Sequence, residues 1–406
     1  MYSAGNLSVA ATTLGGGTRR SGVSLLYSSG GEERVVLDLG AELRAGFSTD
    51  ARPLYTSAGV QLTPADAHHA RLLSDTLRTV YREHLLVDAK TRKVAVVDHG
   101  LSREGRLLVA RVLLSTLRAP LVTFYPAAVA SLVTCGRSAG LVVDCGVPCA
   151  RVAPVYDGRL LAPYVGATAV GQGMLRRSVR GLVMQFGRFH PAKGGAEEGV
   201  PVDEHLLSDE VVEVLARKTL YAASVPPPDP HMCRALGVGS VDPALAEWFE
   251  ANRTSPTAPS TTCLTVKTPS TGGGLGTLSF PSWIRERATE VLLWGDAPAD
   301  LCGLVDCVVH TVARCPMDTR RALVHGILVV GALAEVPGLR ARLLQDVVDR
   351  LRKDRRWNGL ADDAALAEVS HGAGMNAVLP AERPWVGVAL AVAARIGGDD
   401  VKLDSL

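Results

Sequence analysis

The stretch VVLDLG (Val35–Gly40) guides the interpretation of this 406-residue sequence, because its design returns as LVVDCG (Leu141–Gly146). Each copy is an apolar run with an aspartate near its end, Asp38 or Asp144, then one residue and a glycine. Such a run predicts a buried strand ending in a tight turn, where glycine lets the backbone approach a ligand. Two copies predict two facing lobes that each offer one carboxylate to a shared cleft. A magnesium nucleotide would suit that cleft, with phosphates on backbone N–H groups and the metal held through water. The pattern leaves open the alternative that both are strand-ending turns kept for the fold.

Strands and helices alternate over much of the sequence, which predicts an α/β fold with largely parallel sheets. β-branched runs predict strands at Arg34–Leu39, Lys93–Asp98, Leu141–Asp144, Ala150–Tyr156 and Gly326–Val330. Helical periodicity predicts helices at Ala65–Leu86, Arg103–Leu117, Ala127–Val133 and Gly338–Lys353. In the last of these, Leu339, Leu343, Val347 and Leu351 form one apolar stripe. Ser224–Pro230 and Thr254–Ser282 are rich in Pro, Ser, Thr and Gly, and they are predicted to be surface connections.

Composition excludes several classes of protein. Lys and Arg number 43 against 41 Asp and Glu, a formal charge of +2 that shows no basic excess for nucleic acid or an anionic membrane. No apolar run approaches the roughly 20 residues that span a bilayer. Eight cysteines are too few for a disulfide scaffold, and their spacing does not make a paired CxxC zinc site. We therefore expect a soluble, intracellular protein, and residues 1–33, rich in Gly, Ser and Thr, are expected to be a flexible lead-in.

Several motifs, in the order in which actin carries them, resemble actin's nucleotide-binding loops. Asp38-Leu39-Gly40 followed by Arg44-Ala45-Gly46-Phe47 resembles the first phosphate loop and its Lys-Ala-Gly-Phe. Leu141–Gly158 resembles the second phosphate loop with its return strand. The later motifs are similar to actin's Asp-x-Arg segment, its adenosine loop and its Trp-Ile-Gly, at Cys315–Leu323, Ile327–Val347 and Trp385-Val386-Gly387. The resemblance implies the duplicated actin-like ATPase fold, with two lobes around a central cleft.

Among actin relatives the chain resembles most the actin-related protein 10 family, the pointed-end subunit of dynactin. Tyr81–Val97, Asp144–Gly146 and Cys315–Arg320 carry that likeness. The stretch from Phe47 to Tyr81 is about half as long as in actin, where it builds the small pointed-end lobe and its inserting loop. The implied domains are a first lobe at 34–140, with a shortened subdomain at about 50–80, and a second lobe at 141–384. A divergent subdomain at about 176–282 lies within the second lobe, and 385–406 returns to the first.

The resemblance also implies a degraded cleft. Ala127 stands where actin has its water-orienting glutamine, and Arg151 stands where it has the phosphate-sensing histidine, so no catalytic residue is expected. Further departures from actin's loops are Ala41-Glu42, Val147-Pro148, Ala216-Arg217 and Gly331–Glu335. If ATP or ADP with Mg²⁺ is retained, the implied contacts are Asp38, Gly40, Arg44, Asp144, Gly146, Gly331 and Gly338. Of these, Asp38 and Asp144 would hold the metal through water.

The function that the resemblance implies is a non-catalytic subunit that caps the pointed end of dynactin's actin-like filament. Its partners would be the filament subunits and the other pointed-end subunits, and indirectly dynein, in cytoplasmic transport along microtubules. Two alternatives stay open. One is a weak ATPase or sugar-kinase-like enzyme of the same fold. The other is a nuclear actin-related subunit of a chromatin-remodelling complex, for which the basic run Arg350–Arg356 is a weak import signal.

Overall fold

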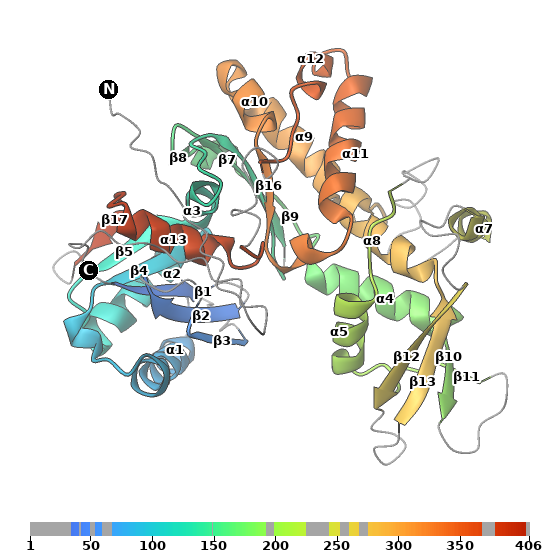
Figure 1. Ribbon diagram of the computed structural model, residues 1–406, viewed down its shortest axis with the longest axis horizontal. Coiled ribbons are helices and arrows are strands. Elements are labelled where there is room, and N and C mark those ends of the chain that lie inside the picture. The colour runs from blue at the N-terminus through green and yellow to red at the C-terminus, as the bar shows by residue number, and fades with distance from the viewer. Residues whose placement is uncertain are drawn as a thin grey trace, which may run out of the picture. The chain divides into compact units, whose positions relative to one another are not determined.

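The computed structural model describes residues 34–39, 42–48, 53–58, 67–147, 149–191, 199–224, 243–251, 260–267, 275–367 and 378–402. The predicted lead-in at residues 1–33 and all of the predicted connection at 224–230 except Ser224 lie outside these ranges. Contacts divide the chain into two compact units. Unit 1 comprises Met1–Val142, Pro154–Ala162 and Leu366–Leu406, and unit 2 comprises Val143–Ala153 and Pro163–Ala365. The predicted α/β composition is confirmed in both units (Figure 1).

Unit 1 is built on a six-stranded sheet in the order β17-β5-β4-β1-β2-β3. Its central strands β1, β4 and β5 are parallel, and β2 returns antiparallel to β1. The bounds are β1 Val35–Leu39, β2 Glu42–Phe47, β3 Tyr55–Ala58, β4 Val94–Asp98, β5 Val122–Pro126 and β17 Asp399–Val401. The predicted strands at Arg34–Leu39 and Lys93–Asp98 are thus confirmed to within one residue.

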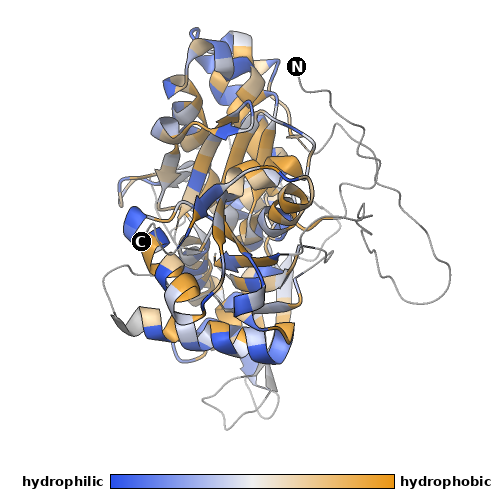
Figure 2. Ribbon diagram, turned by 90° about the vertical axis from the view of Figure 1, so that its left-hand side faces the viewer, coloured by the Kyte–Doolittle hydropathy of each residue, from blue (hydrophilic) through white to orange (hydrophobic). Residues whose placement is uncertain are grey.

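Alternate residues of β1 face opposite sides of this sheet, as the two-residue period of a strand requires. Val35 and Leu37 join an apolar cluster with Leu73, Leu77 and other residues from the helices on that side. Val36, with Ala95 and Val97 of β4, packs in a second cluster that includes Trp385. Figure 2 shows hydrophobic residues along the strands, whereas the helices carry hydrophilic residues as well. Asp38, two residues after Val36, therefore belongs to the side of the sheet that carries Trp385.

The helices of unit 1 depart from the predicted single elements in one respect. The predicted helix at Ala65–Leu86 is α1 (Ala67–Thr79) followed by a π-helical stretch, Val80–Leu85. Likewise Arg103–Leu117 divides into α2 (Arg103–Arg111) and a π-helical Val112–Thr116. The other helices are α3 Ala127–Val133, which has the predicted bounds, and α13 Arg383–Ala393. Wider turns do not interrupt the apolar periodicity enough to be visible in the sequence.

The sheet that follows in the chain has the order β16-β6-β7-β8, with β9 paired to β7. Its hairpin strands β6 and β7 confirm the predicted pair, and both run from one unit into the other. A four-stranded sheet in unit 2 has the order β11-β10-β13-β12, and β14 pairs with β15. The bounds are β6 Gly140–Cys145, β7 Ala150–Tyr156, β8 Arg159–Leu160, β9 Gly166–Thr168, β10 Arg188–Pro191, β11 Val200–Pro201, β12 Thr261–Lys267, β13 Leu275–Pro281, β14 Gly295–Asp296, β15 Leu301–Cys302 and β16 Ile327–Val330.

The prediction that Thr254–Ser282 is a loop-rich connection is wrong for most of its described part. Strands β12 and β13 form an antiparallel pair that runs from Thr261 opposite Pro281 to Lys267 opposite Leu275. Prolines at this density argue against a strand, but Pro281 stands at the end of β13, where proline is tolerated.

The helices described in unit 2 include α11, which confirms the predicted amphipathic segment. Leu339, Leu343, Val347 and Leu351 are at most 1% exposed, as their common stripe requires. The bounds are α4 Gln172–Phe186, α5 Asp209–Lys218, α7 Pro243–Ala251, α8 Ile284–Trp294, α9 Leu304–Arg314, α10 Met317–Val324, α11 Leu339–Lys353 and α12 Asn358–Ala361. No helix in the described part of the chain is both long and apolar enough to cross a membrane.

Candidate functional site

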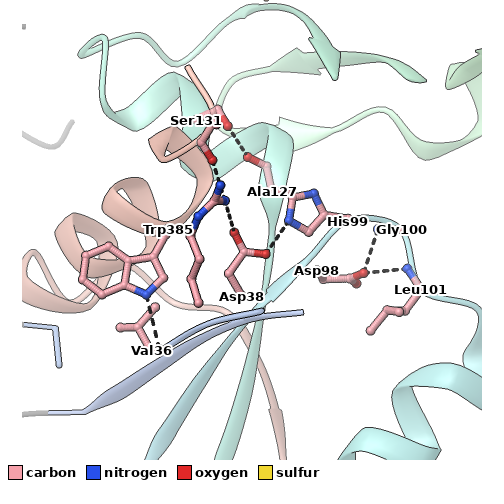
Figure 3. Close-up of polar contacts among 11 residues, drawn as sticks. Val36, Asp38, Asp98, His99, Gly100, Leu101, Ala127, Ser131 and Trp385 are labelled. Atoms are coloured by element: carbon pink, nitrogen blue, oxygen red, sulfur yellow. Dashed lines mark hydrogen bonds and ion pairs between the residues drawn. The ribbon is translucent and has the colours of Figure 1, made fainter. Parts of the chain in front are cut away.

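Asp38 lies near the end of β1 with its side chain only 1% exposed, and it forms the centre of a buried polar cluster in unit 1. His99 Nε2 lies 2.8 Å from Asp38 Oδ1, and Arg44 donates a hydrogen bond to Oδ2 at 3.4 Å. Figure 3 shows Asp38 beside His99 and above the strands, with Trp385 and Ala127 nearby. The structure thus brings together two residues named from the sequence, Asp38 and Arg44, and adds one that was not, His99.

The turn after β4 fixes the position of His99. Asp98 Oδ1 accepts hydrogen bonds from the backbone N–H groups of Gly100 at 2.8 Å and Leu101 at 2.7 Å. Gly100 has φ +86°, a conformation that glycine adopts readily. Ser102 then caps α2 by accepting from the Gly105 N–H at 3.0 Å. These hydrogen bonds hold the backbone that follows His99, which places its imidazole within reach of Asp38.

The β1–β2 hairpin brings Arg44 to the same carboxylate. Asp38 and Arg44 are directly opposite each other in the antiparallel register. The guanidinium NH1 that contacts Asp38 also donates to the Ala381 carbonyl at 2.7 Å, and Arg44 is 9% exposed. Arg44 is therefore a buried partner of the carboxylate. Gly40 and Ala41, which were predicted to belong to the same loop, lie outside the described residues.

The second Asp-x-Gly motif lies in unit 2, at the turn after β6. Gly146 donates from its N–H to the Cys149 carbonyl at 3.2 Å, which closes the turn. The first residues of α4 bind the same loop: Gln172 N–H donates to the Gly146 carbonyl at 3.2 Å, and Gly173 N–H to that of Val147 at 3.1 Å. Helix α4 thus begins on the loop and holds its backbone. Pro148, part of the Val147-Pro148 departure from actin's loops, lies outside the described residues.

Gly331 follows β16 and lies against this second motif. It has φ +89°, and a Cβ atom placed there would lie 2.6 Å from the Cys145 carbonyl oxygen and 3.1 Å from Asp144 Oδ1. A side chain at residue 331 would therefore collide with the strand that carries Asp144. The structure brings Asp144, Gly146 and Gly331 into one region of unit 2.

Gly338 has a different neighbour. It caps the start of α11 with φ +81°, and a Cβ there would lie 2.5 Å from the Ala222 carbonyl oxygen. The Ala222 N–H also donates to the Pro337 carbonyl at 2.8 Å. The glycine is therefore required by close backbone packing, whether or not a ligand binds.

The two residues that the resemblance places at actin's water-positioning sites lie in α3 and β7. Ala127 begins α3, is 7% exposed, and packs in the apolar cluster with Trp385. Its carbonyl accepts a hydrogen bond from Ser131 Oγ at 2.7 Å. Arg151 lies in β7, where its backbone faces Ala167 of β9. The Ala127 side chain cannot orient a water molecule, because a methyl group neither donates nor accepts hydrogen bonds.

Glu213 is a polar centre that the sequence did not indicate. On α5, it accepts hydrogen bonds from Gln172 Nε2 at 3.1 Å and from Arg217 Nε at 2.6 Å, and it also pairs with Arg176. In the sequence, Arg217 was noted only as part of Ala216-Arg217, one of the departures from actin. The structure shows that it forms an ion pair within its own helix, one turn from Glu213. Within the described residues there is no group of three or more His, Cys, Asp and Glu side chains that could hold a metal ion.

We predict that the cysteines of unit 2 differ strongly in reactivity. Burial, with a smaller effect from the neighbouring Asp144 carboxylate, raises the pKa of the Cys145 thiol, and burial raises the pKa of Cys307 from 9.0 to about 12. Since the thiolate is the reactive form, a rise of this size lowers its population about a thousandfold at neutral pH. Cys263 is exposed and serves as the internal control. In the native protein, iodoacetamide should label Cys263 well before Cys145 or Cys307, as mass spectrometry can follow. Equal labelling rates would contradict the burial of the Cys145 and Cys307 thiols.

The comparison with known protein families identifies one match. The family model described as Actin matches residues 71–190 of this chain. The matched segment runs from α1 through the β6–β7 hairpin to β10, so it contains His99, Ala127 and Asp144. This match and the mixed α/β structure together support an actin-like assignment.

Proposed function

We propose that this actin-like chain does not hydrolyse ATP and acts as the terminal subunit at the pointed end of an actin-like filament, that of dynactin. The observation that carries the loss of hydrolysis is the buried Ala127, which the resemblance to actin places where actin orients its attacking water. Phosphoryl transfer depends on positioning and charge stabilisation, so the loss of a positioning group is severe. The actin-family match supplies the fold that this comparison requires.

The terminal role rests on the shortened stretch between Phe47 and Tyr81. Its described part contains the short strand β3 (Tyr55–Ala58) and helix α1 (Ala67–Thr79). In actin the corresponding stretch carries the loop that inserts into the next subunit. A head-to-tail contact makes an open filament, and changing one of its two faces ends growth at that face. In this proposal the chain docks through its unaltered end, works in the cytoplasm, and offers the altered face to the other pointed-end subunits of dynactin.

The nuclear alternative has little support from the basic run Arg350–Arg356. Arg350 pairs with Asp306, Arg352 with Asp362, and Arg356 with Asp354. Arg356 also lies 5.8 Å from the centre of the Trp357 ring. Three cations of the run therefore have partners on their own unit, whereas an import signal must be free to bind its receptor.

The hydrolysis part of the proposal is tested in single-turnover conditions with excess protein over radiolabelled ATP and Mg²⁺. We expect no phosphate release above the protein-free background, because the Ala127 side chain has no group that could position the water. Ala127→Gln is the second variant to measure, because glutamine supplies the side-chain amide that residue 127 lacks in the native chain. Release by the native chain that disappears in Asp38→Asn would contradict the proposal and favour the ATPase alternative.

The partner is tested by affinity purification of the tagged full chain from cells, followed by mass spectrometry. Recovery of dynactin and dynein subunits is expected. Recovery of chromatin-remodelling subunits without dynactin would instead favour the nuclear alternative.

A further inference from the structure

The Asp38 carboxylate of unit 1 already has cationic or hydrogen-bonding partners at both of its oxygens. Oδ1 faces His99 Nε2 at 2.8 Å and Oδ2 faces Arg44 at 3.4 Å, while the side chain is 1% exposed. An ionised carboxylate can only accept hydrogen bonds, so the His99 Nε2 atom must carry a proton. The chain itself therefore supplies the donors for this buried negative charge.

Both donors are held in place by contacts that do not involve Asp38. Arg44 is fixed opposite Asp38 by the β1–β2 register, and it is anchored to the Ala381 carbonyl at 2.7 Å. His99 stands in the turn that the Asp98 carboxylate closes through the N–H groups of Gly100 and Leu101. Preorganised donors lose little conformational freedom when they bind the carboxylate, which makes the cluster a stable arrangement.

A carboxylate that binds a nucleotide-bound magnesium ion needs surroundings different from those of Asp38. Mg²⁺ keeps several of its waters and is bound through one or two carboxylates together with phosphates. A carboxylate that serves it must therefore present an oxygen to water, whereas the Asp38 side chain is 1% exposed and both of its oxygens have protein donors. Asp38 does not fit the metal-holding role that the actin-like assignment implies for it.

We infer that Arg44 as counter-charge and His99 as hydrogen-bonding partner take the place of a hydrated metal ion at Asp38, so that unit 1 folds and stays stable without a divalent cation at this carboxylate. The carboxylate is needed as long as Arg44 is present, because it neutralises a buried guanidinium. This inference is independent of the proposed filament role, because it concerns the stability of the free chain.

The first test uses the chelator-treated, nucleotide-free full chain and Mg²⁺ alone as the probe. A metal bound to the native state at a hundred times its Kd raises the Tm of a folding unit of roughly 200 residues, the size of unit 1, by roughly 5–10 °C. We expect no such rise for the native chain as MgCl₂ replaces EDTA. A rise that Asp38→Asn abolishes would overturn the inference. A rise that persists unchanged in Asp38→Asn assigns the metal to another site and leaves the inference standing.

The second test asks whether Arg44 is the counter-charge. In EDTA, Arg44→Gln should lower Tm by roughly 5–10 °C, since it leaves a buried carboxylate without its guanidinium. The double variant Asp38→Asn/Arg44→Gln should recover most of that loss, because the buried charge is gone as well. Arg111→Gln, an exposed arginine of α2 in the same unit, is the matched control and should change Tm by about 1 °C or less.

The outcomes separate this inference from the proposed function. If Arg44→Gln behaves like Arg111→Gln, or if the double variant is no better than Arg44→Gln, the inference is wrong. If Arg44→Gln does not fold, the Mg²⁺ titration of the native chain and of Asp38→Asn still decides whether a divalent cation binds at Asp38. If the metal tests succeed while the chain fails to bind filament ends, only the proposed function is lost.

Discussion

Replacing Arg342 with methionine should lower the free energy of unfolding of unit 2 by about 3–5 kcal/mol, the usual cost of removing one partner from a buried ion pair. Arg342, on α11, is 1% exposed and binds Glu290 of α8 through two hydrogen bonds, at 3.0 and 3.1 Å. It also donates to Asp346 at 3.0 Å and to the Ala223 carbonyl at 3.0 Å. Methionine fills similar volume but leaves two carboxylates without their cation. Urea denaturation followed by tryptophan fluorescence measures the loss.

Arg350 on the same helix is the matched control. Its pair with Asp306, at 3.3 Å, has an arginine side chain that is 38% exposed. Partly exposed pairs contribute about 1 kcal/mol or less, so Arg350→Met should have a small effect. Equal losses in the two variants would contradict the burial of the Arg342 cluster.

The penalty of Arg342→Met should depend on pH. Burial already raises the pKa of Glu290 and Asp346, although Arg342 opposes the rise in both. Without the guanidinium, the folded-state pKa of each carboxyl rises further above its unfolded value. A carboxyl with a raised pKa stabilises the fold at low pH and loses that contribution as pH increases. The difference in the free energy of unfolding between Arg342→Met and the native chain should therefore be smaller at pH 5 than at pH 8. A larger difference at pH 5 would contradict this account.

Replacing Gly387 with alanine is the other change with a large expected effect. Gly387 follows Trp385 and Val386 in α13, and a Cβ there would fall well inside van der Waals contact with the Ala130 carbonyl of α3. Because a backbone carbonyl cannot rotate away, the two helices must separate, and the free energy of unfolding should fall by about 3 kcal/mol. Trp385, which is fully buried and donates to the Val36 carbonyl at 3.3 Å, would be displaced with the helix.

Gly359→Ala provides the control for this substitution. Gly359 lies in α12, and a Cβ atom there has no neighbour within 4 Å. Alanine should stabilise the helix by about 0.5–1 kcal/mol, since it restricts the unfolded chain. A calorimetric scan of both variants distinguishes the two cases. A harmless Gly387→Ala would show that α13 does not lie as close to α3 as the structure places it.

Two of the six strands in the sheet of unit 1 could be predicted from the sequence, because β1 and β4 are short apolar runs with an aspartate at or near the end, whereas β2, β3, β5 and β17 were not predicted. The runs at Val35–Leu39 and Val94–Asp98 fulfil that pattern. Strand β12 was missed although TTCLTVK contains β-branched residues in a strand-like pattern, because the surrounding Pro and Gly outweighed that signal. The π-helical segments were missed because a wider turn keeps almost the same apolar spacing as an α-helix.

The candidate site was only partly visible in the sequence. Asp38 and Asp144 could be selected from their shared motif, since each lies near the end of a buried apolar strand, and Gly331 was selected through the resemblance to actin's adenosine loop. His99 could not, because its contact depends on β1 and β4 being parallel neighbours with Asp38 opposite Val97. That pairing is a property of the folded sheet. The sequence VVDHG did show another Asp-x-Gly run, but nothing in it indicated that the histidine would bind the first aspartate.

The measurement that tests the central claim most directly is fluorescence microscopy of growing actin-like filaments with trace amounts of the labelled full chain. The account predicts one label at the pointed end of each filament, no further growth at that end, and no polymer from the chain alone in Mg²⁺ and ATP. Labels distributed along the filaments, or self-assembly of the purified chain, would show that the protein extends a filament instead of terminating it.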